Sequence, residues 1–201
     1  VKKIDFNQCC LMVVKCEGTP QAFNRIKNRV TAIYKKHRGV CLGAEPGRSF
    51  AKVKFDFPHL RDYVMDRSIM ADVSETATTW DNLRTLHESG LADVEQAIKD
   101  TGVDAWVGCH LSHSYRTGAS LYFTFGCLQR EGREIEQYLY VKKAAEDAFM
   151  KNGGTLSHHH AVGTEHLPWV EEDLSPTGLK AVKALKAGLD PNDIMNPGKI
   201  I

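Results

Sequence analysis

The chain has 201 residues, of which 42% are hydrophobic and 25% are charged, the profile of an ordinary globular domain. Its formal net charge of +1 gives no electrostatic reason to expect a nucleic acid or an anionic membrane as a partner. No apolar run approaches the roughly 18 residues needed for a transmembrane segment. Residues 1–8 lack an initiating Met and the apolar centre of a secretory signal, so we expect a segment of a longer protein.

The spacing of the six cysteines argues against a metal or redox motif. There is no Cys-x-x-Cys pair, which would indicate a thiolate zinc site or a dithiol centre. Several of the cysteines lie in segments that resemble strands, so we expect free, buried thiols in a reducing, cytoplasmic compartment. The six residues are Cys9, Cys10, Cys16, Cys41, Cys109 and Cys127.

The first part of the chain predicts a strand, a helix and a loop. Residues 9–15 are a continuous apolar run rich in Val, which favours a buried strand. Thr19 before Pro20 is a helix-start signal, and apolar side chains continue at helical spacing until Gly39. Residues 43–54 contain glycine and polar side chains, and we expect a loop there.

Helices and strands follow in a regular order. A short helix is expected over residues 58–66, a strand over 68–76 and an amphipathic helix over 80–99. Two strands, 104–112 and 119–127, then form a hairpin.

A long helix over residues 130–151 ends at a glycine-containing stop signal, and short helices follow in the tail. The element order is β-α-β and then α-β-β-α. Two such halves predict an α+β fold, an antiparallel sheet covered by helices in the ferredoxin-like manner, with a helical C-terminal tail. No linker is visible, so we expect one domain over residues 1–201.

Three consecutive histidines, His158, His159 and His160, follow the end of the last long helix. Imidazole titrates near neutrality and can exchange a proton or bind phosphate or metal. Successive side chains on an extended backbone point to opposite sides, so a turn is needed before all three can meet. The run predicts a functional site; in the alternative, one histidine is functional and two are structural.

His110 and Tyr122 lie in the two strands of the predicted hairpin. His110 shares a strand face with Ser112, whereas His113 and Tyr115 lie on the other face. The phenol of Tyr122 can donate a hydrogen bond, or exchange a proton if a local charge lowers its pKa. Taken singly, Tyr122 fits a core position better than a catalytic one, and His110 fits both.

Two further segments are less informative by themselves. Arg61 and Asp62 predict only a solvated surface pair, and residues 190–199 are typical of a tight turn and cap. Neither type of glycine-rich phosphate-binding loop is present, so the chain has no pyrophosphate site of its own.

Taken together and in this order, the motifs resemble the C-terminal, substrate-side domain of FAD-linked oxidases of the vanillyl-alcohol-oxidase superfamily. Residues 188–199, GLDPNDIMNPGK, are similar to the ending common in that superfamily. Residues 157–163, SHHHAVG, resemble the SHHHGVG loop of the alkyldihydroxyacetonephosphate synthase family, with Ala161 in place of the first glycine. The resemblance covers residues 43–201.

The resemblance also implies roles for single residues. Leu60-Arg61-Asp62, followed by Glu75-Thr76 and Trp80-Asp81, is similar to a pattern of the synthase family that places Arg61 at the substrate-binding arginine. GASLYF over 118–123 places Tyr122 at the catalytic tyrosine. The complete set implied is Tyr122, His158, His159 and His160 for catalysis (His159 as base), Arg61 and His110 for substrate, and Asn196 and Lys199 near the flavin.

Some positions depart from the relatives. Thr164-Glu165-His166 stands where the synthases carry basic residues, and Pro197-Gly198-Lys199 is the oxidase form of the ending. Hydroxy-acid dehydrogenases of the superfamily bind a divalent metal through two histidines and a loop glutamate. The corresponding positions are His110, Tyr122 and His159, which lack the carboxylate that such an ion favours, so we expect no metal site.

The resemblance therefore implies the substrate-binding and catalytic cap of an FAD-dependent enzyme that exchanges acyl for alkyl on acyl-dihydroxyacetone phosphate in ether lipid synthesis. Oxidised FAD would act as an electrophile without net redox change. The implied partners are a separate N-terminal FAD-binding domain, absent from this chain, a lipid-phosphate or other small-molecule substrate, and a second copy in a homodimer.

Three alternatives stay open. The first is an FAD-dependent oxidase or dehydrogenase that transfers a hydride from a hydroxy acid or alcohol. The second is a non-catalytic metal-binding module built on His110 and His158–His160. In the third, the chain is inactive by itself.

Overall fold

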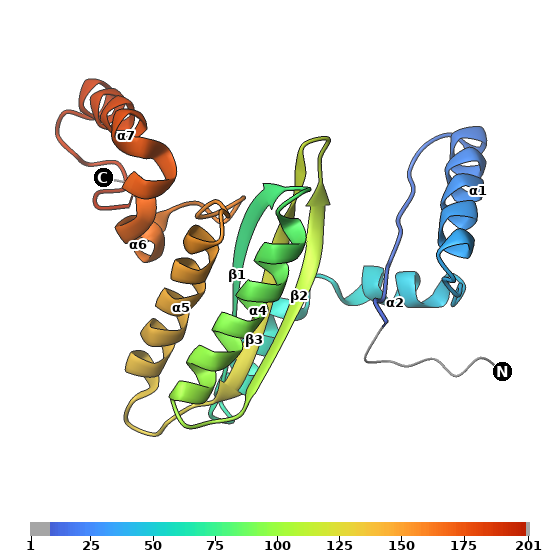
Figure 1. Ribbon diagram of the computed structural model, residues 1–201, viewed down its shortest axis with the longest axis horizontal. Helices are drawn as coiled ribbons and strands as arrows, with labels where there is room; N and C mark the ends of the chain where they lie inside the picture. Colours follow the sequence, from blue (N-terminus) through green and yellow to red (C-terminus); the bar gives the residue numbers. More distant parts are fainter. Residues whose placement is uncertain (1–8, 200–201) are drawn as a thin grey trace. The chain divides into compact units, whose positions relative to one another are not determined.

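The computed structural model describes residues 9–199, and the chain divides into two compact units, Val1–Leu60 and Arg61–Ile201. The described part of the first unit contains helices α1 (Pro20–Lys36) and α2 (Glu45–Val53). Helix α3 (Phe57–Met65) crosses the boundary between the units. The sheet and all later helices belong to the second unit (Figure 1).

Helix α1 begins where the sequence signal predicts. The Thr19 hydroxyl accepts a hydrogen bond from the Ala22 amide at 3.3 Å, and Pro20 occupies the first turn, where its missing N–H costs nothing.

Two expectations for the first unit are wrong. Residues 9–16 form neither helix nor strand, and their apolar side chains are exposed, because no other described segment pairs with them. Residues 43–54 contain α2 instead of a loop. Pro46 in its first turn and the i,i+3 ion pair between Arg48 and Glu45 favour a helix, and they outweigh the single Gly47 inside it.

The second unit is built on a three-stranded antiparallel sheet in the order β1-β3-β2. Its strands are β1 (Ile69–Thr79), β2 (Ala105–Ser114) and β3 (Gly118–Leu128). Helices α4 (Leu83–Asp100) and α5 (Glu134–Lys151) lie side by side against one face (Figure 1). The predicted α+β class, an antiparallel sheet covered by helices, is confirmed, although the strand expected over 9–15 is missing from the first half.

The core lies between this sheet face and the two helices. Phe123 and Phe125 on β3 are fully buried against Ile98 of α4 and Phe149 of α5. The Phe123 and Phe149 rings pack at 4.8 Å between centroids. Because side chains alternate along a strand, the residues between these core positions point to the opposite side. We call that side, which α4 and α5 do not cover, the open face.

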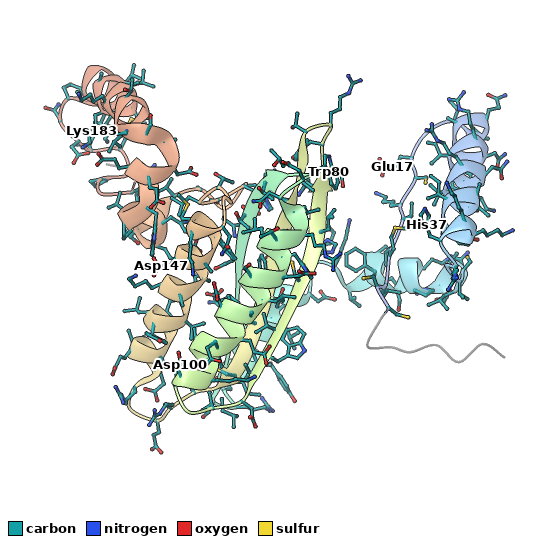
Figure 2. All side chains as sticks on the ribbon, viewed as in Figure 1. Glu17, His37, Trp80, Asp100, Asp147 and Lys183 are labelled. Carbon is teal, nitrogen blue, oxygen red and sulfur yellow. The ribbon has the colours of Figure 1, made fainter. Side chains whose placement is uncertain are left out.

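The tail is helical, as expected, but it contains one long helix besides the short ones. Helices α6 (Gly163–His166) and α7 (Val170–Leu189) flank a short 3-10 turn, η2 (Leu167–Trp169). Helix α7 is broken at Ser175, because the following Pro176 disfavours helical backbone before it. Trp169 donates its indole N–H to Asp147 of α5 at 2.9 Å, on the side of α5 that faces α6 (Figure 2). None of the described helices combines the length and apolar character needed to cross a bilayer.

The cysteines are all free, as expected. Only Cys127 is fully buried, whereas Cys9, Cys10 and Cys41 are exposed. Burial was therefore predicted wrongly for these three. Cys9 and Cys10 lie in the segment that fails to form a strand, and Cys41 lies between α1 and α2.

Gly90 permits the close approach of α4 to the sheet, which generates a testable prediction. A Cβ at this position would lie 2.7 Å from Cζ of Phe123, whose ring is held by Phe149. We expect Gly90→Ala to lower the free energy of unfolding by about 1–3 kcal/mol through overpacking, measured by urea denaturation. Gly188→Ala is the matched control: no atom lies within 4 Å of the position that its Cβ would take, so a gain of about 0.4–1 kcal/mol is expected. Equal effects at the two sites would contradict this packing.

Candidate active site

A row of three polar side chains crosses the open face of the sheet. Glu75 of β1 pairs with Tyr122 of β3, and Tyr122 pairs with His110 of β2. Directly opposed residues of antiparallel strands lie on the same face, so the register places all three side by side.

The Glu75 carboxylate organises the segment of residues 157–163, which we call the histidine loop. Its Oε1 atom accepts hydrogen bonds from the backbone amides of His158 at 3.0 Å and His160 at 2.7 Å, and from the His159 amide between them. Glu75 is only 1% exposed. Folding three successive amides around one oxygen supplies the turn that the histidines need, and adjacent rings lie 5.3 and 4.8 Å apart.

The second oxygen of Glu75 has a different environment. Oε2 is buried and accepts no well-aligned hydrogen bond from the described residues, although Nδ1 of His159 lies 2.6 Å away. Burial opposes ionisation of this carboxyl, but the amides of His159 and His160 and the charges of their imidazoles outweigh it. The pKa of Glu75 is therefore lowered, and the site holds a buried carboxylate.

Both ends of the histidine loop are held by contacts with neighbouring elements of the second unit. At its start, the Thr155 amide donates to Ala77 O at 2.9 Å and the Thr76 hydroxyl donates to Thr155 O at 2.6 Å. Asp173 of α7 accepts from the Leu156 amide at 3.0 Å. These bonds fix the loop at the sheet edge before the histidines begin.

The other end of the loop is held by two charged side chains on successive turns of α5. Lys142, 6% exposed, places its Nζ 2.6 Å from Glu165 and donates to Val73 O at 2.7 Å. One turn later Glu146 lies 3.4 Å from Nε2 of His166. Lys142 therefore links the sheet, α5 and the residues that follow the histidines.

His166 is positioned to carry a proton on Nδ1. Its Nδ1 contacts the carbonyl oxygens of Ala161 and Val162, both at 2.9 Å, and must carry a proton because carbonyls only accept. Its Nε2 faces the buried Glu146 carboxylate. Contact with Glu146 is the largest cause that raises the pKa of His166, against the opposing effect of burial.

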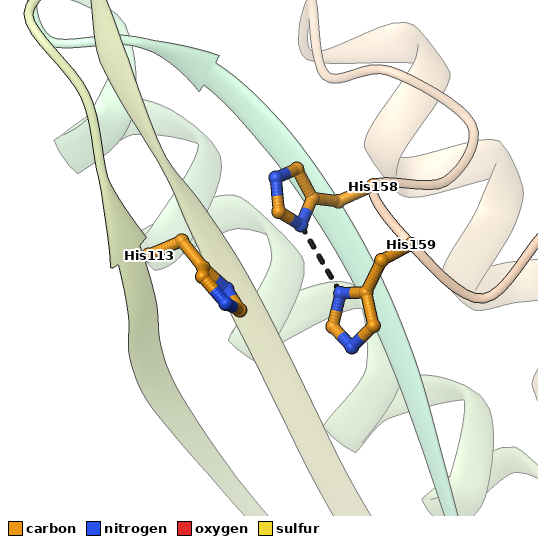
Figure 3. Close-up of side chains that lie close together, drawn as sticks. All are labelled: His113, His158 and His159. Atoms are coloured by element: carbon orange, nitrogen blue, oxygen red, sulfur yellow. Dashed lines mark hydrogen bonds between the residues drawn. The ribbon is translucent and has the colours of Figure 1, made fainter.

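A β-bulge changes which hairpin residues reach the site. The register shifts between Leu111 and Ser114, so the strict alternation that the sequence predicts is broken. His113 consequently lies against the loop, with its ring centroid 5.0 Å from that of His158 and 5.4 Å from that of His159 (Figure 3). Tyr115 also reaches the loop, and its hydroxyl forms a hydrogen bond of 3.0 Å with Nε2 of His158.

Tyr122 contacts the loop edge-on, with its ring 5.4 Å from that of His160. Burial raises the pKa of Tyr122, and the Glu75 and Asp72 carboxylates raise it further. The local charge thus acts against the lowered pKa that the sequence interpretation required, and in this state the phenol keeps its proton. Partial burial lowers the pKa of His160 despite the Glu75 charge, which leaves a neutral imidazole beside a protonated phenol.

The other residues implied for the site lie outside the histidine cluster. Arg61 is exposed on α3, and among residues 9–199 no hydrogen bond or ion pair joins it to the cluster. Asn196 and Lys199 are exposed in the terminal turn, which Asp190 closes by accepting from the amide of Ile194 at 3.0 Å. His110 is exposed beside Tyr122.

Ala161, which stands where the synthase loop has glycine, adopts a positive φ of 65°. The left-handed region costs an L-residue roughly 1–2 kcal/mol, so the family glycine suits this backbone better.

Comparison with known proteins gives the family. The family described as FAD linked oxidases, C-terminal domain, matches residues 1–200. Alkyldihydroxyacetonephosphate synthase of Dictyostelium discoideum is 36% identical over 201 residues, which are 100% of this chain and 33% of that protein. The glycolate oxidase subunit GlcD of Bacillus subtilis is 28% identical over 194 residues, 94% of this chain and 39% of its own length.

A solved structure of alkyldihydroxyacetonephosphate synthase superposes with a TM-score of 0.63 at 30% identity, covering 89% of this chain and 29% of that one. The chain thus spans about a third of the length of the curated synthases that it matches. It belongs to the family of FAD-linked oxidase C-terminal domains. FAD is the cofactor that this membership implies.

Sequence reasoning missed four residues that shape the site. Glu75 was noted only as part of a motif, His113 was assigned to the wrong face, and the pair Glu146–His166 was not considered. A glutamate inside a predicted strand was the one available signal for Glu75, because a carboxylate that becomes buried there requires donors. The other contacts join residues distant in sequence or depend on a bulge, and local patterns do not report them.

The Glu146–His166 contact predicts a pH dependence. The folded pKa of His166 is raised above its ordinary value, so the contact stabilises fully below about pH 6.5 and is lost as the pH rises through the folded pKa. We expect Glu146→Gln to lower the free energy of unfolding by roughly 1–3 kcal/mol at acidic pH and by progressively less at alkaline pH. Urea denaturation across this range measures the difference.

Glu171→Gln serves as control, because Glu171 is an exposed carboxylate in the first turn of α7. Its small effect should not follow the titration of His166. A Glu146→Gln effect that stays constant with pH would disprove the paired imidazolium.

Proposed function

We propose that this chain is the substrate-binding and catalytic cap of an FAD-dependent enzyme that exchanges the acyl group of acyl-dihydroxyacetone phosphate for an alkyl group, in ether lipid synthesis. The observation that carries the proposal is the histidine loop folded around Glu75 beside Tyr122. The 36% identity with a synthase over the whole chain supports it. The full-length protein would be cytoplasmic, and its remaining two thirds would contain an N-terminal FAD-binding domain.

The open face fits the reacting end of a flavin and not its phosphate end. The row of Glu75, Tyr122 and His110 is polar, and the neighbouring pair on this face, Gly108 and Thr124, is small. Trp106, on the same face, is 62% exposed, and such apolar surface favours a covering partner. The phosphate-binding loops are missing from the sequence, so another domain must hold the nucleotide.

When bound, oxidised FAD would supply an electrophilic centre. The residues of this chain would hold the substrate and move its protons. Arg61 would bind the phosphate as a planar, bidentate donor, and His110 would line the pocket. Tyr122 would give up and regain a proton at the substrate, and Asn196 and Lys199 would lie near the flavin.

The histidines would divide two roles. Nδ1 of His159 lies 2.6 Å from the Glu75 carboxylate, which would hold the ring in place while His159 acts as the base. His158 and His160 would contact the phosphate.

An FAD-dependent oxidase or dehydrogenase of a hydroxy acid or alcohol is the second candidate. The similarity to a glycolate oxidase subunit favours it, as does the oxidase form of residues 197–199.

The test is an assay of the full-length protein that contains this chain, with acyl-dihydroxyacetone phosphate and a long-chain alcohol. We expect release of the fatty acid that depends on the alcohol. Under anaerobic conditions the flavin spectrum should end in the oxidised form, because exchange moves no electrons. Lasting flavin reduction by a hydroxy acid, without exchange, would establish the dehydrogenase instead.

Tyr122→Phe tests the proton-transfer role by deleting one oxygen. If Tyr122 moves a proton, turnover should fall on the order of 10²–10⁴-fold, while flavin content and melting temperature stay close to those of the unchanged protein. Tyr115→Phe is the matched control, since it removes a hydroxyl that contacts His158 from the hairpin and not from the central row. Full activity of Tyr122→Phe would remove this residue from the mechanism.

A further inference from the structure

We propose that Glu75, His158 and His159, with His113 as a fourth ligand, form a binding site for a divalent transition-metal cation of the Zn²⁺ class. The inference goes beyond the proposed function, because it concerns cation binding by this chain without flavin or substrate.

The three nearest donor atoms lie close enough together to share one cation. Glu75 Oε2 lies 2.6 Å from His159 Nδ1 and 3.9 Å from His158 Nδ1. The two Nδ1 atoms are 3.1 Å apart (Figure 3). The point equidistant from these atoms is about 2 Å from each. Zinc binds imidazole nitrogen at about 2.0–2.1 Å and carboxylate oxygen at about 2.0–2.2 Å.

Among the described residues, none donates a well-aligned hydrogen bond to Glu75 Oε2, although Nδ1 of His159 lies 2.6 Å away. The other oxygen, Oε1, takes all three loop amides, and the side chain is 1% exposed, so bulk solvent does not reach Oε2. A buried carboxylate oxygen without a well-aligned donor is costly, and a cation would satisfy it.

The facing nitrogens give a second, independent indication. Nδ1 of His158 and Nδ1 of His159 point at each other across 3.1 Å. One proton can bridge two such atoms, but two lone pairs repel and two protons clash. A cation between them accepts both lone pairs, as zinc does in sites with several histidines.

The outer ring nitrogens are held in the manner of metal ligands. Nε2 of His158 is bonded to the Tyr115 hydroxyl at 3.0 Å. Nδ1 of His113 lies 3.2 Å from Oγ of Ser112 and 3.4 Å from Oγ of Ser120, which leaves its Nε2 available. Hydrogen bonds to the far nitrogen orient a ligating histidine and raise its basicity.

His113 completes the coordination. Its ligand atom and those of His158 and His159 all lie within 4.8 Å of one another. His113 is exposed, so no packed core holds its side chain away from the cation.

This donor set differs from that of the hydroxy-acid dehydrogenases, whose corresponding positions are His110, Tyr122 and His159. The carboxylate comes from β1 instead of the loop, and His110 and Tyr122 take no part. The sequence prediction of no metal site rested on the missing loop carboxylate, which Glu75 replaces from another strand. A bound cation would occupy Nδ1 of His159 and compete with its proposed role as base.

The experiment is a titration of this chain with Zn²⁺ alone. Binding is measured by calorimetry and by competition with a chromophoric chelator. Exposed thiols also bind zinc, so the titration uses a background with Ser at Cys9, Cys10, Cys16 and Cys41. The two thiols that remain are Cys109 and Cys127. Burial raises the pKa of both, that of Cys109 to about 12, so both disfavour the thiolate form that binds zinc. We expect one cation per chain, and intense tetrahedral ligand-field bands when Co²⁺ replaces Zn²⁺.

Glu75→Gln, His158→Gln and His159→Gln should each weaken binding at least about tenfold, and His113→Gln should weaken it and alter the Co²⁺ bands. Glu75→Gln keeps Oε1 as acceptor for the loop amides; circular dichroism and thermal melting confirm that each variant is folded. His158 is only partly buried and His159 is exposed, so their variants test the site even if Glu75→Gln does not fold.

The controls are His110→Gln, on the same sheet face, and His160→Gln, in the same loop; both should bind within about twofold of the background protein. Absence of one-to-one binding would overturn the proposal. So would binding that survives His158→Gln and His159→Gln. Glu75, His159 and His160 form a competing group of donors. The proposal would therefore also be overturned if His160→Gln abolished binding while His113→Gln and His158→Gln left it unchanged.

Discussion

A single buried oxygen determines the geometry of the site. Oε1 of Glu75 binds three consecutive amides, and this turns an extended run of histidines into a cluster. The arrangement requires Glu75 to stay ionised, and the amides themselves lower its pKa against the effect of burial. Loop and carboxylate therefore stabilise each other: neither is satisfied alone, because a buried charge needs donors and free amides need an acceptor.

The two faces of the sheet carry different groups of residues. One face carries the apolar core and the helices, while the open face carries Glu75, Tyr122 and His110. Helix α5 serves both sides, because Lys142 and Glu146 reach past the sheet edge to hold the residues that follow the histidine loop. Stability of the core is thereby coupled to the position of the loop, and the contact of Glu146 with His166 makes this coupling depend on pH.

The two roles proposed for the cluster, proton exchange and cation binding, exclude each other at Nδ1 of His159. Nδ1 of His159 either exchanges a proton beside the Glu75 carboxylate or donates its lone pair to a cation. A protonated Tyr122 and a neutral His160 stand next to it, outside the proposed coordination. Membership in the FAD-linked oxidase family implies the flavin, and the proposed roles of the loop concern the substrate protons and the cation.

By itself, the sequence determined the α+β class and the strands and helices of the second unit, because periodicity and capping are local. It misassigned residues 9–15, since a strand exists only if another segment pairs with it. It also misassigned residues 43–54, where glycine and polar side chains favoured a loop but helix α2 forms. Tertiary structure alone decided that Glu75 meets the loop and that a bulge turns His113 toward it. Those contacts join residues far apart in the chain, and their energy depends on burial, which no local pattern records.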